Sequence, residues 1–176
     1  MLEFGYQQWP FAAPPLREKV YQSRPWYAVP QLVQPGNDRT FVPFAPSWED
    51  DILHSEHNAN IVVSLMERLR DFHKMKKLSN YMIKTVVLTE LAEGDLDWDQ
   101  SLDIIFVAVW EKLIQHLNNG KLGRFLSPQY NLFVDMSAVD VEKYYYTANK
   151  ILQQIKKLQG VEEVTFDNVN NIFFNW

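Results

Sequence analysis

The distribution of proline divides this chain into two parts that must fold differently. Eight of the nine prolines precede residue 50, and Pro128 is the one that follows. Proline fixes φ, lacks an amide donor and pushes its predecessor towards extended geometry, so residues 1–46 cannot form a regular helical region. The same segment is rich in aromatic side chains, which solvated tails generally lack. We therefore predict an extended arm over residues 1–50 that lies on protein surface, followed by a globular α/β domain over residues 51–176.

The arm contains one turn motif and several candidate anchors. The turn Pro35-Gly36-Asn37-Asp38 separates two β-like runs, Tyr27–Val33 and Thr40–Phe44, which predicts a small hairpin. Large aromatic residues near prolines are typical interface anchors, because little entropy is lost when such a segment orders. The predicted interface residues are Trp9, Trp26, Tyr27, Phe41, Phe44 and Trp48. Docking on the chain's own domain and docking on a neighbouring chain both remain open.

Helical periodicity begins after the arm. Apolar residues at helical spacing predict a helix from 58 to 77 and a central, buried helix that starts at Asp97 or Asp99 and ends at Gly120. Ser79 caps a segment that Gly94 would end. Its middle is rich in β-branched residues, so helix and strand both remain open over residues 79–93.

The end of the chain predicts a small sheet. Residues 130–136 are expected to form a strand, a helix runs from Ser137 to Gly160, and residues 163–166 and 170–174 are β-like. A right-handed crossover would make the first two strands parallel neighbours. The predicted fold class is thus α+β: one domain with three to four helices, a small mixed sheet near the C-terminus, built as strand–helix–strand with a further hairpin, and the extended arm.

Basic residues gather at two places. Arg68, Arg70 and Lys74, with two lysines after them, form one concentration, and Lys121 and Arg124 flank a Gly-x-x-Gly loop at residues 120–123. Similar loops clamp the nucleic-acid backbone in KH domains. These residues support an alternative function, a nucleic-acid-binding module. A formal net charge of −5 disfavours nucleic acid as a partner.

One cluster holds residues of the types that ligate metals. His54 and His57 lie in an acidic segment, and imidazole with carboxylate is a ligand set for zinc. Their spacing is not that of HExxH, however, and no third ligand is identifiable. Asp95, Asp97 and Asp99 alternate as in a calcium loop, but that loop requires Gly at its sixth position and Glu at its twelfth. A small metalloprotein or enzyme is therefore the second alternative, and no metal or cofactor is predicted.

The remaining composition narrows the function class. The chain contains no cysteine, its first 20 residues do not resemble a signal peptide, and its longest apolar run, residues 104–110, is too short to cross a bilayer. We expect a soluble protein, cytoplasmic or in a virion, with no membrane partner. No catalytic motif is present. An aromatic arm before a small domain resembles subunits of virus or phage particles. The leading hypothesis is thus a non-enzymatic structural or assembly subunit, a homo-oligomer or part of a larger complex, whose arm packs on neighbouring subunits.

Overall fold

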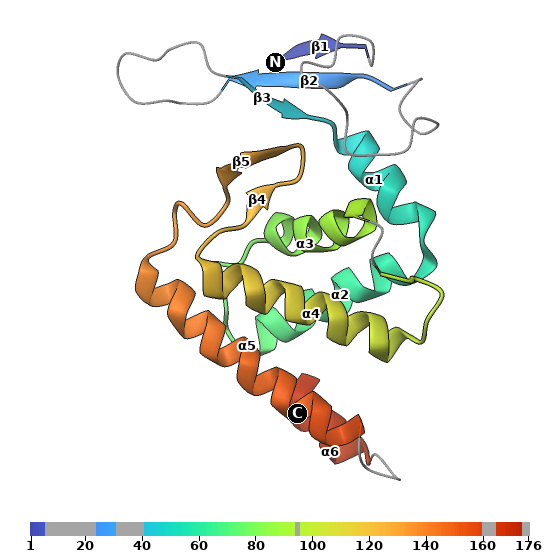
Figure 1. Ribbon diagram of the computed structural model, residues 1–176, viewed down its shortest axis with the longest axis vertical. Helices are drawn as coiled ribbons and strands as arrows, with labels where there is room; N and C mark the ends of the chain where they lie inside the picture. The colour runs from blue at the N-terminus through green and yellow to red at the C-terminus, as the bar shows by residue number, and fades with distance from the viewer. Residues whose placement is uncertain (6–23, 31–40, 94–95, 160–164, 174–176) are drawn as a thin grey trace.

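The computed structural model describes residues 1–5, 24–30, 41–93, 96–159 and 165–173. Helices form the body, and a three-stranded sheet covers one end of it (Figure 1). The predicted α+β class is confirmed. The described strands and helices are β1 (Leu2–Phe4), β2 (Trp26–Pro30), β3 (Phe41–Phe44), α1 (Pro46–Ser55), α2 (His57–Phe72), α3 (Asn80–Glu93), α4 (Leu102–Asn119), β4 (Gly123–Arg124), β5 (Ser127–Asn131), α5 (Ala138–Gln159) and α6 (Phe166–Phe173).

The described parts of the arm form one antiparallel sheet in the order β1-β2-β3. The predicted hairpin is confirmed, because β2 pairs with β3 from Tyr27↔Phe44 to Pro30↔Phe41. Proline is tolerated here since β3 is an edge strand and Pro30 is the last residue of β2. The predicted boundary at residue 50 falls inside α1, which continues directly from the sheet.

Two tryptophans of the arm are buried in the chain's own fold. The indole of Trp48 is fully buried and donates to the carbonyl of Arg24 at 3.2 Å. Trp26 is buried as well, donates to the carbonyl of Gly5 at 3.1 Å and stacks on Phe4. Of the other predicted interface residues, Tyr27 and Phe44 are half-buried and Phe41 is 46% exposed, whereas Trp9 lies outside the described residues. The described residues of the arm therefore pack against the chain's own fold, and an interface role for them stays a prediction.

The helical body is organised around α4, as predicted. This helix packs against α2, α3 and α5, and Trp110 within it donates to the carbonyl of Ala148 at 3.0 Å. Residues 79–93, for which the sequence leaves helix and strand open, form α3. Its β-branched middle is helical because buried neighbours cover nearly its whole circumference, and this packing outweighs the modest propensity cost.

Two boundaries differ from the sequence prediction because of local backbone geometry. The helix expected over 58–77 ends at Phe72, where Lys74 adopts a left-handed φ of 56° and the amide of Met75 bonds back to the carbonyl of Arg70 at 2.9 Å. The expected strand over 130–136 is also wrong in extent. Strand β5 ends at Asn131, whose side-chain oxygen accepts from the amides of Leu122 and Phe133 and so turns the chain.

The expected mixed sheet near the C-terminus is wrong. In the described residues both sheets are antiparallel, and β5 pairs with β4 as a hairpin rather than across a helix. Residues 166–173, expected to contribute β structure, form α6, because apolar residues at 166, 169, 172 and 173 follow helical spacing. Ile172 is buried against the body. Residues 163 and 164 lie outside the described segments. Among those segments, no helix combines the length and apolar character that a bilayer crossing requires.

Candidate functional site

A group of exposed lysines lies where α2 ends and α5 passes it. Lys74, Lys76 and Lys77 occupy the turn between α2 and α3, and all three are exposed. Lys74 adopts a left-handed conformation in this turn, and the buried Met75 and Leu78 anchor the turn in the core while the lysines between and beside them stay exposed. We call this surface the basic ridge; it comprises Lys74, Lys76, Lys77, Lys143, Lys150 and Lys157.

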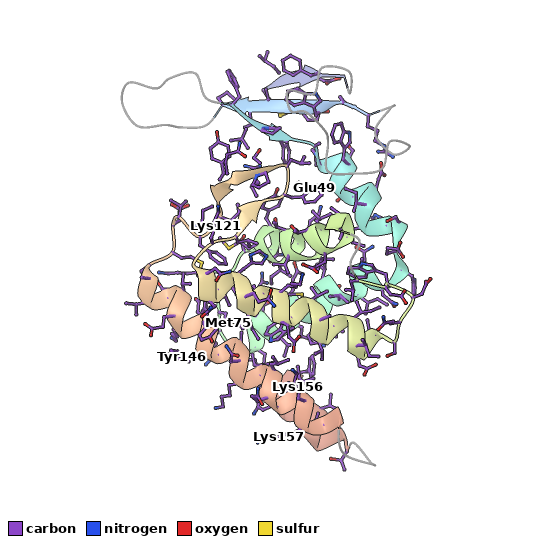
Figure 2. All side chains as sticks on the ribbon, viewed as in Figure 1. Glu49, Met75, Lys121, Tyr146, Lys156 and Lys157 are labelled. Carbon is purple, nitrogen blue, oxygen red and sulfur yellow. The ribbon has the colours of Figure 1, made fainter. Side chains whose placement is uncertain are left out.

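The lysines of α5 extend the ridge along one helix face. Lys143, Lys150 and Lys157 follow each other at intervals of seven residues, which places them on the same face, and each is exposed. The turn is tied to this helix, because the Lys77 ammonium pairs with Asp140 at 2.6 Å and the Lys77 amide donates to the Tyr144 hydroxyl at 3.2 Å. Figure 2 shows Lys157 at the far end of α5. The sequence prediction missed these lysines, although their seven-residue spacing is visible in the sequence.

Arg70, predicted as a nucleic-acid contact, is instead buried beneath the ridge. Its guanidinium donates to the carbonyl of Leu78 at 3.2 Å, to the side chain of Asn80 and to Asp71 at 2.8 Å. The group is only 9% exposed and connects the end of α2 with the start of α3. Arg70 therefore stabilises the turn that carries Lys74, Lys76 and Lys77. Arg68 and Lys74, by contrast, are accessible at the surface.

His73 joins the base of this turn to α6. Its Nε2 donates to the carbonyl of Ile172 at 3.1 Å. Burial lowers the pKa of His73 below its usual value of 6.5, and the positive charge of Lys150 lowers it further, against the opposing effect of that hydrogen bond. The folded protein therefore favours the neutral ring.

We expect acidification to weaken the docking of α6. The pKa of His73 is lower in the folded than in the unfolded state, so the unfolded state binds more protons as the pH falls through about 6.5. The free energy of unfolding therefore decreases as the pH falls through this range. Hydrogen exchange of the α6 amides should accelerate between pH 7 and pH 5.5, after correction for the intrinsic rate. His73→Gln keeps a donor for Ile172 and should abolish this difference. Persistence of the pH effect in that variant would show that another group controls it.

A polar cluster joins α1, α3 and the β4–β5 hairpin. Glu49 in the first turn of α1 is 2% exposed, and its carboxylate accepts from the Tyr81 hydroxyl at 3.0 Å and lies 3.6 Å from the Lys84 ammonium. Lys84 also reaches Asp50 at 2.8 Å, and the Arg124 guanidinium lies 5.4 Å from the centre of the Tyr81 ring. Asp50 is exposed, so the cluster runs from the core to solvent.

Burial dominates the electrostatics of this cluster. It raises the pKa of Glu49, while Lys84, the Tyr81 hydroxyl and Arg124 act to lower it. Burial and the neighbouring Glu49 charge raise the pKa of Tyr81 to about 12, so the phenol stays protonated and donates. The sequence pointed to Glu49 only as one of the acidic residues around His54 and His57, and it did not point to Tyr81 or Lys84, because only the packing of α3 on α1 brings the three together.

The Gly-x-x-Gly loop is a helix end followed by a tight hairpin. Gly120 caps α4 with a left-handed φ of 63°. A Cβ at Gly123 would lie 2.8 Å from the carbonyl oxygen of Pro128, so glycine is required for β4 to approach β5 this closely. Of the two basic residues that flank the loop, Lys121 is exposed and Arg124 is half-buried. The Arg124 guanidinium lies over the ring of Tyr81, a residue of α3 close to the turn that carries the basic ridge.

The two candidate metal ligands are not joined by a third. His54 lies in the last turn of α1, where its Nδ1 is 2.6 Å from the carbonyl of Asp50, and His57 begins α2. In the ranges that the structure describes, no three histidine or carboxylate side chains converge as a metal site. The nearby acidic residues Glu49 and Asp50 lie in the first half of α1 and belong to the polar cluster.

Comparison with known proteins identifies relatives of this chain. Residues 58–151 match the family model described as "Mab-21 protein HhH/H2TH-like domain". The chain is 34% identical over 157 residues to a Drosophila melanogaster "Cyclic GMP-AMP synthase-like protein", covering 87% of this chain and 45% of the relative. It is 32% identical over 148 residues to a Drosophila eugracilis "Cyclic GMP-AMP synthase-like receptor", covering 81% and 39%. The chain thus spans less than half the length of these relatives.

These matches correct the functional expectation from sequence. A structural or assembly subunit of a virus or phage particle is wrong, because the relatives are cyclic GMP-AMP synthase-like proteins and receptors of insects. The expectation of a non-enzymatic protein is wrong for the same reason, since the relatives are named for a synthase. The family match extends from the second residue of α2 into α5 and includes the turn, α3 and the hairpin. The chain therefore belongs to the Mab-21 family and carries its HhH/H2TH-like domain.

Proposed function

We propose that this chain is the helical half of a nucleic-acid-responsive receptor of the cyclic GMP-AMP synthase-like group, and that nucleic acid docks on the basic ridge. The observation that carries the proposal is that three exposed lysines of the α2–α3 turn and three on one face of α5 belong to elements that the Lys77–Asp140 pair holds together. In the part of the chain that the structure describes, only Lys77 among them pairs with a carboxylate. One relative is named a "receptor", and this name agrees with a role in which the protein responds to a bound ligand.

The ridge suits a phosphate backbone better than a protein surface. Lysine binds phosphate as a flexible point charge, and each phosphate that it neutralises releases condensed counterions. Successive lysines on the α5 face are about 10 Å apart along the helix axis, at a rise of roughly 1.5 Å per residue. A rigid helix that carries such a row tracks a charged strand without further rearrangement. The acidic total of the chain does not prevent this, because backbone binding depends on local charge.

Removal of three ridge lysines should weaken nucleic-acid binding on the order of a hundredfold at about 0.15 M salt. The variant is Lys74→Ala, Lys76→Ala and Lys150→Ala together, in the full chain. For every phosphate that is no longer neutralised, the slope of log affinity against log salt should also fall by about one unit. Fluorescence anisotropy with labelled duplex RNA and duplex DNA, at several salt concentrations, measures both quantities.

The matched control for this experiment is Lys156→Ala. Lys156 lies on the same helix, beside Lys157, but its ammonium pairs with Glu111 at 2.6 Å. Its removal should change the affinity less than twofold, because that charge is already compensated. If the triple variant binds with an unchanged slope, or if the intact chain binds neither duplex at low salt, the proposed docking surface is incorrect.

A second function is favoured by the polar cluster, namely holding a nucleotide for the synthase reaction after which the relatives are named. The half-buried Tyr81 ring offers a face on which a base could stack. Lys84 and Arg124 are cations suited to phosphate, and Glu49 can accept from an exocyclic amine. The cluster opens to solvent at Asp50, so a ligand can reach it.

Substitution of Tyr81 tests this second function. Tyr81→Ala should weaken binding of fluorescent ATP or GTP analogues tenfold or more, because base stacking on an aromatic ring contributes about 1–3 kcal/mol. Tyr81→Phe keeps the ring and loses only the hydroxyl that bonds Glu49, so its affinity should stay within a few-fold of the wild type. Equal losses in both variants, measured by direct titration, would rule out a stacking role.

A further inference from the structure

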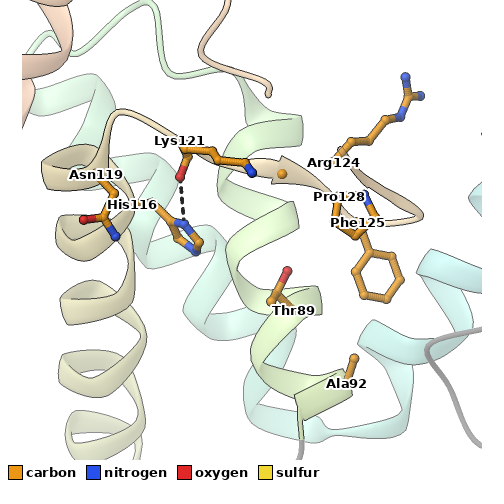
Figure 3. A pocket seen from close by; sticks show the side chains of 9 residues that line it. Thr89, Ala92, His116, Asn119, Lys121, Arg124, Phe125 and Pro128 are labelled. Atoms are coloured by element: carbon orange, nitrogen blue, oxygen red, sulfur yellow. Dashed lines mark hydrogen bonds between the residues drawn. The ribbon is translucent and has the colours of Figure 1, made fainter. Parts of the chain in front are cut away.

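A cavity lies between the β4–β5 hairpin and the C-terminal halves of α3 and α4. Its volume is about 520 Å³, within the range typical of small-molecule sites. Figure 3 shows Thr89 and Ala92 of α3 facing His116 and Asn119 of α4 across the space that Lys121 and Phe125 border. Neither the ridge nor the sequence-predicted metal ligands contribute to it.

The charged side chains that line this cavity, Lys121 and Arg124, are both cations. His116, Lys121 and Arg124 line it together with the amide of Asn119 and the hydroxyl of Thr89, and among the described residues no aspartate or glutamate does. The Nδ1 of His116 lies 3.0 Å from the carbonyl oxygen of Lys121, so Nδ1 is the donor there and Nε2 of the neutral ring is an acceptor for a ligand hydroxyl or amine (Figure 3). A set of cationic and neutral polar groups of this kind selects an anion.

The rest of the lining is apolar. Ala92, Phe125 and Pro128 form this part, and Phe125 is itself largely buried, so its position is determined by the core. The close approach of Gly123 to Pro128 fixes the hairpin that brings these residues beside α3. A ligand that fits both parts carries an anionic group at one end and a flat apolar group at the other.

From this arrangement we infer that the cavity between α3, α4 and the β4–β5 hairpin binds a nucleoside monophosphate, with its phosphate at Lys121 and Arg124, a ribose hydroxyl donating to Nε2 of His116, and its base against Phe125 and Pro128. The volume accommodates one such molecule. Arg124 belongs to this cavity and also lies over Tyr81 of the polar cluster. A ligand in the cavity would draw the Arg124 guanidinium towards its phosphate and away from Tyr81. The cavity and the polar cluster would thus be coupled through this one side chain.

Isothermal titration of the full chain with AMP, GMP, adenosine and inorganic phosphate tests the inference. We expect AMP or GMP to bind, with adenosine and phosphate each weaker by tenfold or more, because each retains only one of the two recognised parts. His116→Asn preserves a donor to the Lys121 carbonyl, and Lys121→Gln changes an exposed residue. Together they should weaken binding of the monophosphate at least tenfold, since they remove the Lys121 charge from the phosphate and the imidazole acceptor from the ribose.

Two controls separate this site from the proposed functions. Lys156→Ala changes a lysine that pairs with Glu111 and does not line the cavity, so it should leave the affinity for the monophosphate within twofold, whereas the triple ridge variant tests nucleic acid alone. The inference is overturned if no monophosphate binds at millimolar concentration, or if inorganic phosphate binds as tightly as AMP. It is equally overturned if the His116→Asn, Lys121→Gln variant binds the monophosphate as tightly as the wild type, because the ligand would then occupy another place, such as the polar cluster.

Discussion

Trp48→Ala is expected to lower the free energy of unfolding by about 3–5 kcal/mol, a large share of the stability of a domain this size. The indole is fully buried beneath the three-stranded sheet, and its Nε1 donates to the carbonyl of Arg24. Truncation leaves a cavity between α1 and the sheet and removes the indole donor from that carbonyl. Urea unfolding followed by circular dichroism measures the change.

The conservative variant separates packing from hydrogen bonding. Trp48→Phe should cost roughly 1–3 kcal/mol, because it retains most of the apolar contact and removes the indole donor from the Arg24 carbonyl. Sedimentation should give the same mass for the wild type and both variants, since Trp48 docks within its own chain. A fall in mass without a fall in stability would instead place this tryptophan at an interface between chains.

Arg70→Ala is expected to destabilise the protein by about 3 kcal/mol or more. The guanidinium is buried and donates to the carbonyl of Leu78 and the side chain of Asn80, and both lose this donor when it is removed. Because these contacts hold the end of α2 against the start of α3, thermal unfolding should shift down by several degrees. Differential scanning calorimetry provides the measurement.

Two comparisons identify the origin of this loss. Arg70→Lys should recover little stability, because an ammonium cannot reach three acceptors in the planar arrangement of a guanidinium. Lys74→Ala, four residues further along and exposed, should change stability by less than about 0.5 kcal/mol while it weakens nucleic-acid binding. If Arg70→Ala left stability intact and reduced only binding, the sequence-based assignment of Arg70 as a nucleic-acid contact would stand.

The candidate site could be predicted from the sequence in part. The basic run at residues 68–77 pointed to a nucleic-acid surface, and Lys74 is exposed there. The sequence did not distinguish Arg70 from its neighbours, because burial depends on how α2 meets α3. Glu49 stood out in the sequence only as part of the acidic segment around His54 and His57, and its meeting with Tyr81 and Lys84 carries no local signal, since α1 and α3 come together only through packing.

The sequence by itself determined the local elements: prolines are consistent with the extended strands of the described arm, β-like runs marked the strands that pair as β2 and β3, and apolar periodicity placed α4 and α5. These features depend on φ restriction and side-chain spacing over a few residues. Tertiary structure alone decided that α3 is a helix and that Trp26 and Trp48 are buried within the chain's own fold. In each of these cases local preference is weak, and the burial available against distant parts of the chain determines the conformation.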